Sequence, residues 1–336
     1  MQEYKIYTLK KGNIEMTVTN FGGRVMTLLV PDCQGNMDDI VLGYKTVDEY
    51  LNNSGERFLG AVCGRFANRI AKGTFCIDGE RYNLPINNNG QTLHGGLKGL
   101  DLVWWDVVSS SEDELHLRYI SPDGEEGFPG ELTIDMVYRL TENNEFSIEY
   151  TAQTTKKTAV NLTHHSFFNL AGEGNGTINN HRMQIFADSF IPIDDVSIPT
   201  GEIREVMGTP FDFRSATPIG QHLGEEYDQL KTGSGYDHCW VINGKGLRRA
   251  ARVEEPVSGR VMEVWTDQPG MQFYGGNFFD GKTPAKSGKG SYDYRGSFAL
   301  ETQNFPDAPN QPNFPNSILN PGETYKHHCV YCFSVS

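Results

Sequence analysis

Positive charge is scarce in this sequence. Its 336 residues include 29 Lys and Arg against 43 Asp and Glu, which gives a formal net charge of −14. Such a chain repels phosphate backbones and anionic membrane surfaces, and no cluster of Lys or Arg offsets the excess locally. Nucleic acid and membranes are therefore not expected as partners.

Long apolar runs are missing as well. No segment approaches the roughly 20 apolar residues that a membrane-spanning helix requires. The opening stretch MQEYKIYTLKKGNIEM also lacks the apolar core of a signal peptide. We expect a cytoplasmic protein, with the earlier removal of a signal peptide as the alternative.

Cysteine is infrequent, and its six positions are too scattered for a disulfide framework, so free thiols are expected. The last two form a C-x-x-C pattern after His327 and His328, which admits a metal or redox site. However, the segment YKHHCVYCFSV alternates like a strand, in which residues three apart face opposite sides. The second ligand pair of a structural zinc site is absent, so we expect a strand and no metal. The cysteines are Cys33, Cys63, Cys76, Cys239, Cys329 and Cys332.

Alternation of apolar and polar residues is, by contrast, the dominant pattern. It runs through residues 14–19, 115–119, 132–136 and 146–150, and it predicts half-buried antiparallel strands. Turn signals punctuate the chain between such segments. They are Asp78-Gly79, Glu142 to Asn144, and Asn243-Gly244.

Helical periodicity is brief. Residues 219–230 carry apolar side chains at helical spacing and predict a short surface helix, and VDEYLNN (47–53) predicts another turn of helix. No internal repeat, low-complexity tract or shift in composition divides the chain. The sequence therefore predicts a single domain over residues 1–336. We expect it to be mostly β, built from two large packed antiparallel sheets with a few short helices.

Several polar stretches combine Asn, Gln, His, Arg or a carboxylate with aromatic rings and permissive glycines. This mixture suits a sugar, whose hydroxyl groups need planar hydrogen-bonding side chains and whose C–H face lies on a ring. The stretches are CGRFANRIAKG, NNNGQTLHGG, NLTHHSFFNLAG, SGYDHCW, PGMQFYGGNFF and, where a predicted strand ends, LETQNFPDAPN.

Each candidate residue also has a purely structural interpretation. Arg65 and Arg69 could cap carbonyl groups or form ion pairs, and His94 could simply be exposed in its glycine-rich loop. His164 and His165 cannot both face one pocket if they lie on a strand, so at most one of them is expected to be catalytic. Composition alone indicates a β protein with a carbohydrate site.

Taken together and in order, the motifs resemble those of the aldose 1-epimerase family, also called the galactose mutarotases. The resemblance extends from NFGGRV near the N-terminus to LNPGETY near the C-terminus, and so covers nearly the whole chain. Its motifs are GRFANRIAKGTF, LHGG, GEEGFPG, HHSFFNLAG, IPTGEI with GTPFDFR, GYDH, PGMQFYGGN and LETQNFPDAPN.

The resemblance implies a large antiparallel β-sandwich, the galactose mutarotase-like supersandwich, and no cofactor. It also implies that Glu301 of the LETQ motif is the general base and that His165 is the general acid. The substrate-binding residues that it implies are Asn68, Arg69, His94, Asp237 and Gln272.

The sequence departs from the family pattern at a few places. His164 stands where an Asn is usual, and Phe305 where a Trp is common. The aromatic pair Phe167 and Phe168 begins with Phe where the first ring is often Tyr. None of these residues is the implied acid or base, so the departures bear on substrate preference.

The implied reaction interconverts the α and β anomers of free hexoses such as galactose and glucose. A base removes the C1 hydroxyl proton while an acid protonates the ring oxygen, and rotation about C1–C2 of the open aldehyde precedes closure. Ionised Glu301 and protonated His165 would fill these roles. The only partner expected is the aldose substrate, and the protein is expected to be a monomer or a homodimer.

Other functions are compatible with parts of the pattern. A glycoside hydrolase needs two carboxylates, for which only Asp237 accompanies Glu301. A non-catalytic carbohydrate-binding protein would keep the aromatic rings without the acid and base. A hexose-phosphate 1-epimerase would need a cluster of basic residues around the phosphate, and only Arg65 and Arg69 are conspicuous.

Overall fold

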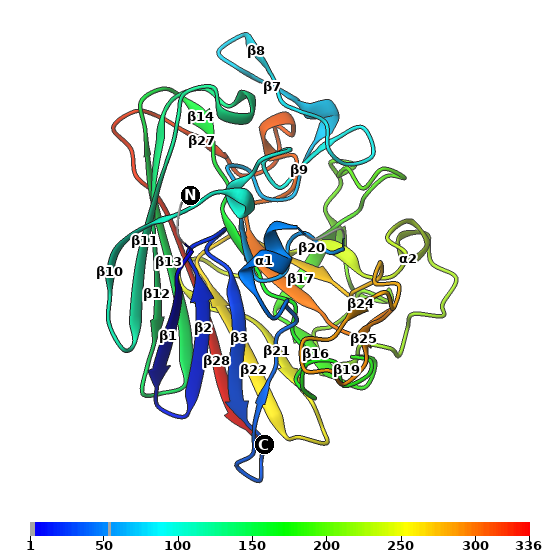
Figure 1. Ribbon diagram of the computed structural model, residues 1–336. Coiled ribbons are helices and arrows are strands. Elements are labelled where there is room, and N and C mark those ends of the chain that lie inside the picture. The colour runs from blue at the N-terminus through cyan, green and yellow to red at the C-terminus, as the bar shows by residue number, and fades with distance from the viewer. Residues whose placement is uncertain (1–3, 53–54) are drawn as a thin grey trace.

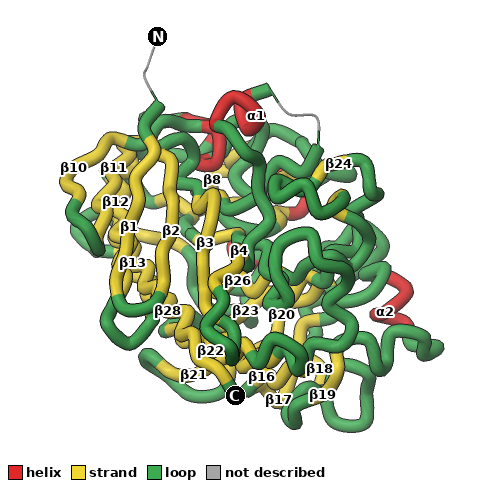
Figure 2. Tube along the Cα trace, turned by 60° about the horizontal axis from the view of Figure 1, so that its bottom comes forward, coloured by secondary structure: helices red, strands yellow, loops and turns green. Residues whose placement is uncertain are grey.

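The computed structural model describes residues 4–52 and 55–336. Strands dominate it, and the helices are few and short (Figures 1 and 2). Within the described residues, no helix has the length and apolar character that crossing a membrane would demand. The six cysteines are free thiols, as predicted.

One layer of the fold is a nine-stranded antiparallel sheet. The C-terminal strand lies at its centre, so the end of the chain is part of the main sheet and the predicted C-terminal strand is confirmed (Figure 1). The spatial order is β10 (Asp106–Ser110), β11 (Glu114–Ser121), β12 (Leu132–Leu140), β13 (Glu145–Thr154), β28 (Tyr325–Val335), β22 (Arg260–Thr266), β21 (Arg248–Glu254), β16 (Arg182–Ile185), β19 (Thr217–Pro218).

The other layer consists of two smaller sheets. One contains β1 (Ile6–Lys11), β2 (Ile14–Thr19), β3 (Val25–Pro31) and β4 (Met37–Asp39). The other has the order β18 (Arg204–Glu205), β17 (Ala187–Ile191), β20 (Asp237–Ile242), β23 (Gly270–Tyr274) and β26 (Ala299–Gln303).

The two smaller sheets are connected to each other and share one core with the nine-stranded sheet. Isolated bridges from Val41 to Phe168 and from Phe168 to Phe298 lead from the edge of the first sheet to the start of β26. A single hydrophobic cluster contains Leu9 of β1, Ile134 of β12 and Phe273 of β23. The predicted sandwich is therefore confirmed, with the difference that its second layer is divided in two.

Short ribbons and helices connect the strands of the two layers. The ribbons are β5 (Ala61–Cys63) with β15 (Thr163–His165), β6 (Arg69–Ile70) with β9 (Thr92–Leu93), β7 (Thr74–Ile77) with β8 (Glu80–Asn83), β14 (Thr158–Ala159) with β27 (Ile318–Leu319), and β24 (Thr283–Pro284) with β25 (Ser291–Tyr292). The helices are α1 (Val47–Leu51) and α2 (Asp228–Thr232), with 3₁₀ turns at Ala71–Gly73, Leu100–Leu102, Glu125–Gly127 and Ala308–Asn310.

The predicted turns have two outcomes. Asp78 and Gly79 have positive φ values of 52° and 85° and close the hairpin between β7 and β8, as their sequence indicates. Asn243 and Gly244, in contrast, connect β20 to β21, which belong to different sheets. A turn signal reports where the chain reverses and carries no information about which sheet the next strand joins.

The longer predicted helix is wrong. Residues 220–224 form turns, and of the segment 219–230 only residues 228–230 are helical, as the first part of α2. Gly220 and Gly224 interrupt the apolar pattern, and each glycine disfavours a helix that is already too short to be stable alone. The predicted turn at 47–53 is confirmed for α1, where Thr46 forms a capping box with Glu49; its last residue lies outside the described residues.

Candidate active site

A cavity of about 320 Å³ lies beside the five-stranded sheet. All of the site residues predicted from the sequence line it, with the exception of Gln272. The lining residues are Glu56, Phe58, Asn68, Arg69, Asn88, Asn89, Leu93, His94, His165, Phe167, Ser197, Asp237, Tyr274, Phe278 and Glu301.

A larger hollow of about 710 Å³ lies over α1 and residues 280–286, but its lining is less suited to catalysis. None of the predicted site residues lines it. Its charged groups include Lys282, which pairs with the neighbouring Asp280, and Lys286, which pairs with Asp39 at 2.8 Å. We therefore place the candidate site in the smaller cavity.

Sheet register brings Glu301, Gln272 and Asp237 to one face. Gln272 pairs with Glu301 on one side and with Cys239 on the other, and Cys239 follows Asp237 at a spacing of two. Residues that oppose each other share a face of the sheet, as do residues two apart. Gln272 Nε2 donates a hydrogen bond to Asp237 Oδ1 over 2.7 Å. Gln272 thus holds the Asp237 carboxylate and is itself not among the residues that line the cavity.

The paired histidines face opposite ways, as the strand interpretation requires. His164 lies in the core, where its ring nitrogens contact the Tyr138 hydroxyl at 3.2 Å and Ser166 Oγ at 2.6 Å. His165 faces the cavity and stacks on the ring of Phe167, with centroids 4.6 Å apart. The structure therefore brings His165 and not His164 together with Glu301.

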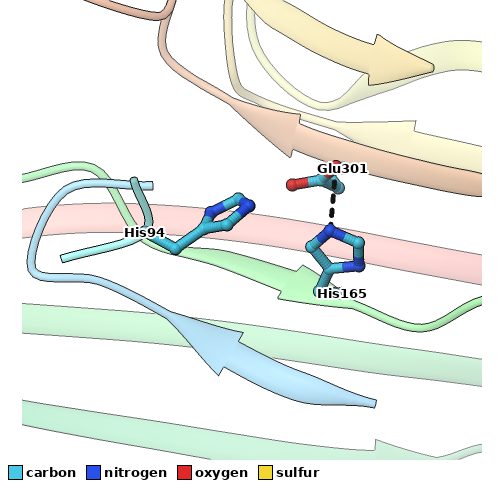
Figure 3. Close-up of side chains that lie close together, drawn as sticks. All are labelled: His94, His165 and Glu301. Carbon is cyan, nitrogen blue, oxygen red and sulfur yellow. Dashed lines mark ion pairs between the residues drawn. The ribbon is translucent and has the colours of Figure 1, made fainter. Parts of the chain in front are cut away.

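His165 and Glu301 lie in direct contact in the wall of the cavity (Figure 3). His165 Nε2 lies 3.3 Å from Glu301 Oε1, and both side chains are almost completely buried. Burial raises the pKa of Glu301 well above its usual value, and the nearby Asp237 raises it further. Burial lowers the pKa of His165 to about 3. These directions oppose the ionised carboxylate and protonated imidazole expected from the sequence, because a buried pair favours its neutral forms.

Three of the buried polar atoms that lack a partner in the described residues belong to the candidate site residues. Among the described residues, Glu301 Oε2, His165 Nδ1 and Gln272 Oε1 have no hydrogen-bond partner. Such atoms are costly in a protein interior, and they are expected where a polar ligand provides the missing bonds. The cavity is therefore suited to a ligand rich in hydroxyl groups.

His94 extends into the cavity from the loop after β9. Its Nδ1 accepts a hydrogen bond of 3.0 Å from the backbone N–H of Asn68, and its ring meets that of His165 edge to face, with centroids 5.3 Å apart. Burial lowers the pKa of His94 well below its usual value, and the charges of His165 and Arg69 lower it further. The ring is therefore neutral, and its one proton lies on Nε2 because Nδ1 is the acceptor.

The two arginines singled out in the sequence have different positions. Arg65 is buried and donates to the carbonyl oxygens of Ser121, Pro122 and Gly130, which is the structural interpretation. Arg69 lines the cavity, where its guanidinium lies 3.3–3.4 Å from Asn88 Oδ1. Only Arg69 is therefore available to a ligand.

Some of the lining residues were not found in the sequence. Glu56 is half-buried, and its Oε1 accepts the Phe58 N–H at 3.0 Å; burial raises the pKa of its carboxyl group. Phe278 is 65% exposed and stacks on Tyr274 at the rim of the cavity. The aromatic pair lies in a stretch that the sequence marks as suited to a sugar, but Glu56 precedes the arginine motif in a segment without any recognisable signal.

The chemistry of the donor set bears on whether a metal could bind. His94, His165 and Glu301 offer ligand atoms within 4.8 Å of one another. The separation of 3.3 Å between His165 and Glu301 matches the edge of a tetrahedral zinc site with bonds of about 2.0–2.1 Å. His94 does not fit, because the nitrogen that faces the cavity carries the proton. The site is better suited to proton transfer than to metal binding.

The C-terminal pair of histidines has structural contacts. His327 lies in the core, where Nε2 contacts Thr302 Oγ1 at 2.8 Å and Nδ1 contacts the carbonyl oxygen of Leu162 at 3.0 Å. His328 faces the other side of β28 and contacts Ser147 Oγ at 2.9 Å. The neighbouring histidines therefore have separate surroundings, as alternation along a strand predicts.

Known proteins resemble this chain over nearly its whole length. A model of the aldose 1-epimerase family matches residues 5–332. The chain is 46% identical over 333 residues to galactose mutarotase of Bos taurus, covering 98% of this chain and 94% of that protein. It is 36% identical over 337 residues to aldose 1-epimerase of Escherichia coli strain K12, covering 99% and 96%. A crystal structure of the GalM/aldose epimerase homologue from C. elegans superposes with a TM-score of 0.91 at 32% identity, covering 99% of each chain. The chain belongs to the aldose 1-epimerase family, as its motifs indicate.

Proposed function

We propose that this protein is an aldose 1-epimerase, an isomerase that interconverts the α and β anomers of free hexoses such as galactose and glucose. The observation that supports this most directly is the buried contact of 3.3 Å between His165 Nε2 and Glu301 Oε1 in the wall of a small cavity. One acid and one base suffice for ring opening, and each group contributes typically about 10²- to 10⁴-fold to the rate.

In the proposed reaction, His165 and Glu301 together hold one proton, which can lie on either side chain. Glu301 takes the proton of the C1 hydroxyl while His165 gives a proton to the ring oxygen, and the two exchange these duties for closure of the other anomer. In the sugar-free site, burial favours the proton on Glu301. Hydroxyl groups of a bound sugar stabilise the carboxylate and imidazolium by hydrogen bonds. Both forms hold the same number of protons, so the pair can pass between them without exchange with solvent.

The remaining predicted residues hold the sugar in our proposal. His94 offers the Nε2–H to an oxygen at C1 or in the ring, and the Arg69 guanidinium donates to hydroxyl groups. Asp237 accepts from a hydroxyl group, with Gln272 fixing the carboxylate. Orientation by such contacts adds to the acid and base contributions, since the reacting atoms must meet in a defined geometry.

Charge in the cavity is unfavourable for a phosphorylated substrate. The lining contains the carboxyl groups of Glu56, Asp237 and Glu301, and Arg69 is the one Lys or Arg among the described lining residues. A hexose-phosphate epimerase would place several basic groups around the phosphate dianion. A glycoside hydrolase is also disfavoured, because the carboxylate of Asp237 is bonded to Gln272 in a supporting arrangement.

Polarimetry tests the proposal. Freshly dissolved α-galactose and α-glucose should reach anomeric equilibrium faster with the protein than without it. Methyl galactoside has no C1 hydroxyl proton, so it should compete with galactose without releasing a reducing sugar. Mutarotation at the spontaneous rate would indicate a binding protein, and sustained release of galactose from the methyl galactoside would indicate a hydrolase.

We also propose a single domain, a cytoplasmic location and a monomer or homodimer. A single domain is supported by the main hydrophobic cluster, which includes both Leu9 and Phe333. A reducing compartment is supported by the six free cysteines. Analytical ultracentrifugation tests the oligomeric state.

A further inference from the structure

The ribbon of β6 and β9 ends in an unusual exchange of hydrogen bonds. Its register pairs Arg69 with Leu93 and Ile70 with Thr92, so Asn68 and His94 are the next residues to oppose each other. The His94 N–H donates to Asn68 O over 3.0 Å, as an antiparallel ladder requires. The Asn68 N–H, however, donates to the His94 ring at Nδ1 over 3.0 Å. The His94 ring thus accepts the hydrogen bond that the His94 carbonyl oxygen would accept in a regular ladder.

Left-handed backbone conformations make this exchange possible. Asn68 has a φ of 63° and His94 a φ of 50°, a region in which Asn and His are tolerated better than most residues. The side chain of Asn68 supports its own turn, because Oδ1 accepts the Arg69 N–H over 2.8 Å. The backbone here is also confined from the other side, where a Cβ at Gly95 would lie 1.8 Å from Gly64 O.

The bond determines which nitrogen of His94 carries the proton. A neutral imidazole has one N–H, so acceptance at Nδ1 leaves the proton on Nε2. A proton on Nδ1 would face the Asn68 N–H, donor against donor. The rings of Phe58 and His165, with centroids 4.6 Å and 5.3 Å away, restrict rotation. Figure 3 shows the ring extending toward His165 and Glu301.

We propose that Asn68 is a positioning residue that acts on the reaction through its main chain, by holding His94 as a donor with the proton on Nε2. The amide side chain of Asn68 is then of secondary importance, although it also lines the cavity. This inference rests on the proposed epimerase function only in its kinetic consequence. The arrangement of the proton can be measured without any substrate.

Nuclear magnetic resonance measures the tautomer in the intact protein. With ¹⁵N-labelled histidine, and with His94→Gln to assign the signal, long-range ¹H–¹⁵N correlations distinguish a protonated nitrogen from an accepting one. We expect His94 to show a protonated Nε2 and an accepting Nδ1. A protonated Nδ1 in the wild-type protein would overturn the inference.

Paired substitutions separate the main chain from the side chain. Asn68→Gly and Asn68→Ala both remove the amide, so any loss of sugar contact should raise KM equally in both. Only alanine is strained at this φ. We expect kcat of Asn68→Ala to be at least about tenfold below that of Asn68→Gly, because a small displacement of a donor has a large effect on rate. The His94 signal should keep its wild-type pattern in Asn68→Gly and lose it in Asn68→Ala.

Asn89 provides a matched control. It lines the same cavity and has a φ of 45°. Asn89→Gly and Asn89→Ala should therefore differ in backbone strain but not in kcat. Equal kcat in the two Asn68 variants would show that the backbone bond to His94 has no special role. The same conclusion would follow if the Gly and Ala variants of Asn89 differed in kcat by as much as those of Asn68. A wild-type protein without mutarotase activity would contradict the proposed function and leave the tautomer measurement intact.

Discussion

His165 Nε2 lies 3.3 Å from Glu301 Oε1, although the two residues belong to different strands, β15 and β26. The strands are joined beside this contact, where Thr163 Oγ1 donates to the carbonyl oxygen of Thr302 over 2.8 Å. The proposed acid and base are therefore held by backbone elements on both sides, and in our proposal they need little reorganisation when a sugar binds.

Replacement of the carboxylate should stop the chemistry and leave the fold. Glu301→Gln keeps the size of the side chain but removes the base, so we expect kcat to fall at least about a hundredfold, or about 3 kcal/mol. The measurement is polarimetry together with sugar binding by calorimetry. Turnover near the wild-type value in a folded variant would remove Glu301 from the mechanism.

Neighbouring histidines should respond differently to the same substitution. His165→Asn removes the group that faces Glu301 and should reduce kcat about as much as Glu301→Gln. His164→Asn disrupts the contacts with Tyr138 and Ser166 in the core. It should lower the free energy of unfolding by about 1–3 kcal/mol while kcat changes only a few fold. Urea unfolding and polarimetry on the same samples check both effects, and the reverse ranking would mean that His164 is the acid.

The pH dependence of kcat/KM should reveal the shared proton. The active pair holds one proton, so activity is lost at low pH when His165 gains a second and at high pH when Glu301 loses the first. Burial lowers the pKa of His165 to about 3 and raises that of Glu301. We therefore expect a bell with its acid limb near pH 3 and its alkaline limb well above the ordinary carboxyl value. A flat profile from acid to alkaline pH would contradict the pair.

Two neutralising variants should move the alkaline limb in opposite directions. Asp237 raises the pKa of Glu301, and Arg69 lowers it. Asp237→Asn should therefore shift the alkaline limb to lower pH, and Arg69→Gln should shift it to higher pH. Each variant should also weaken sugar binding, so the position of the limb and not the height of the profile is the measurement. Shifts of the same sign would show that the limb belongs to another group.

The site residues that could be predicted from the sequence are those marked by a pattern within a short stretch of the chain. Glu301 and His165 stand in motifs, and alternation along a strand correctly separates His165 from His164. Gln272 was expected to bind the sugar, yet it is not among the cavity-lining residues, and the register of β20 and β23 places it beside Asp237, to which its Nε2 donates. Such cross-strand pairing depends on residues far apart in the chain. Glu56 went unnoticed for the same reason, since only tertiary packing brings its loop to the cavity.

Fold prediction has the same limit. Alternation identified β2, β11, β12 and β13 because burial of one face is recorded directly in the order of residues. It could not show that β28 inserts between β13 and β22, or that Asn243 and Gly244 lie between two sheets. Helical spacing over 219–230 gave a wrong prediction because most of its apolar residues lie in turns and not in a helix. Of the four apolar residues at that spacing, only Leu230 lies in α2.

Removal of metal ions should leave activity unchanged. The proposed reaction moves only protons, and His94 presents a protonated nitrogen to the cavity and so cannot complete a zinc site with His165 and Glu301. Dialysis against EDTA followed by polarimetry tests this expectation. Loss of activity that zinc restores would require a different protonation of His94 and would also contradict the role proposed for Asn68.

The last prediction concerns two glycines on either side of β9, Gly90 before the strand and Gly95 directly after His94. Gly90 and Gly95 have positive φ values of 81° and 92°, so alanine is strained at both. They differ in space: a Cβ at Gly90 meets no atom within 4 Å among the described residues, whereas one at Gly95 lies 1.8 Å from Gly64 O. Gly90→Ala should therefore lower the free energy of unfolding by about 1–2 kcal/mol. Gly95→Ala should lower it by more than about 4 kcal/mol, because backbone must move against backbone.

Urea unfolding with a constant m value measures both changes. The loop also sets the position of His94, so folded Gly95→Ala should lose kcat, while Gly90→Ala provides the control for positive φ alone. If the two variants lost the same free energy of unfolding, the backbone at Gly64 would be able to move away from a new Cβ without further loss of stability. The close approach of Gly95 to Gly64 would then not be what holds His94 in the cavity.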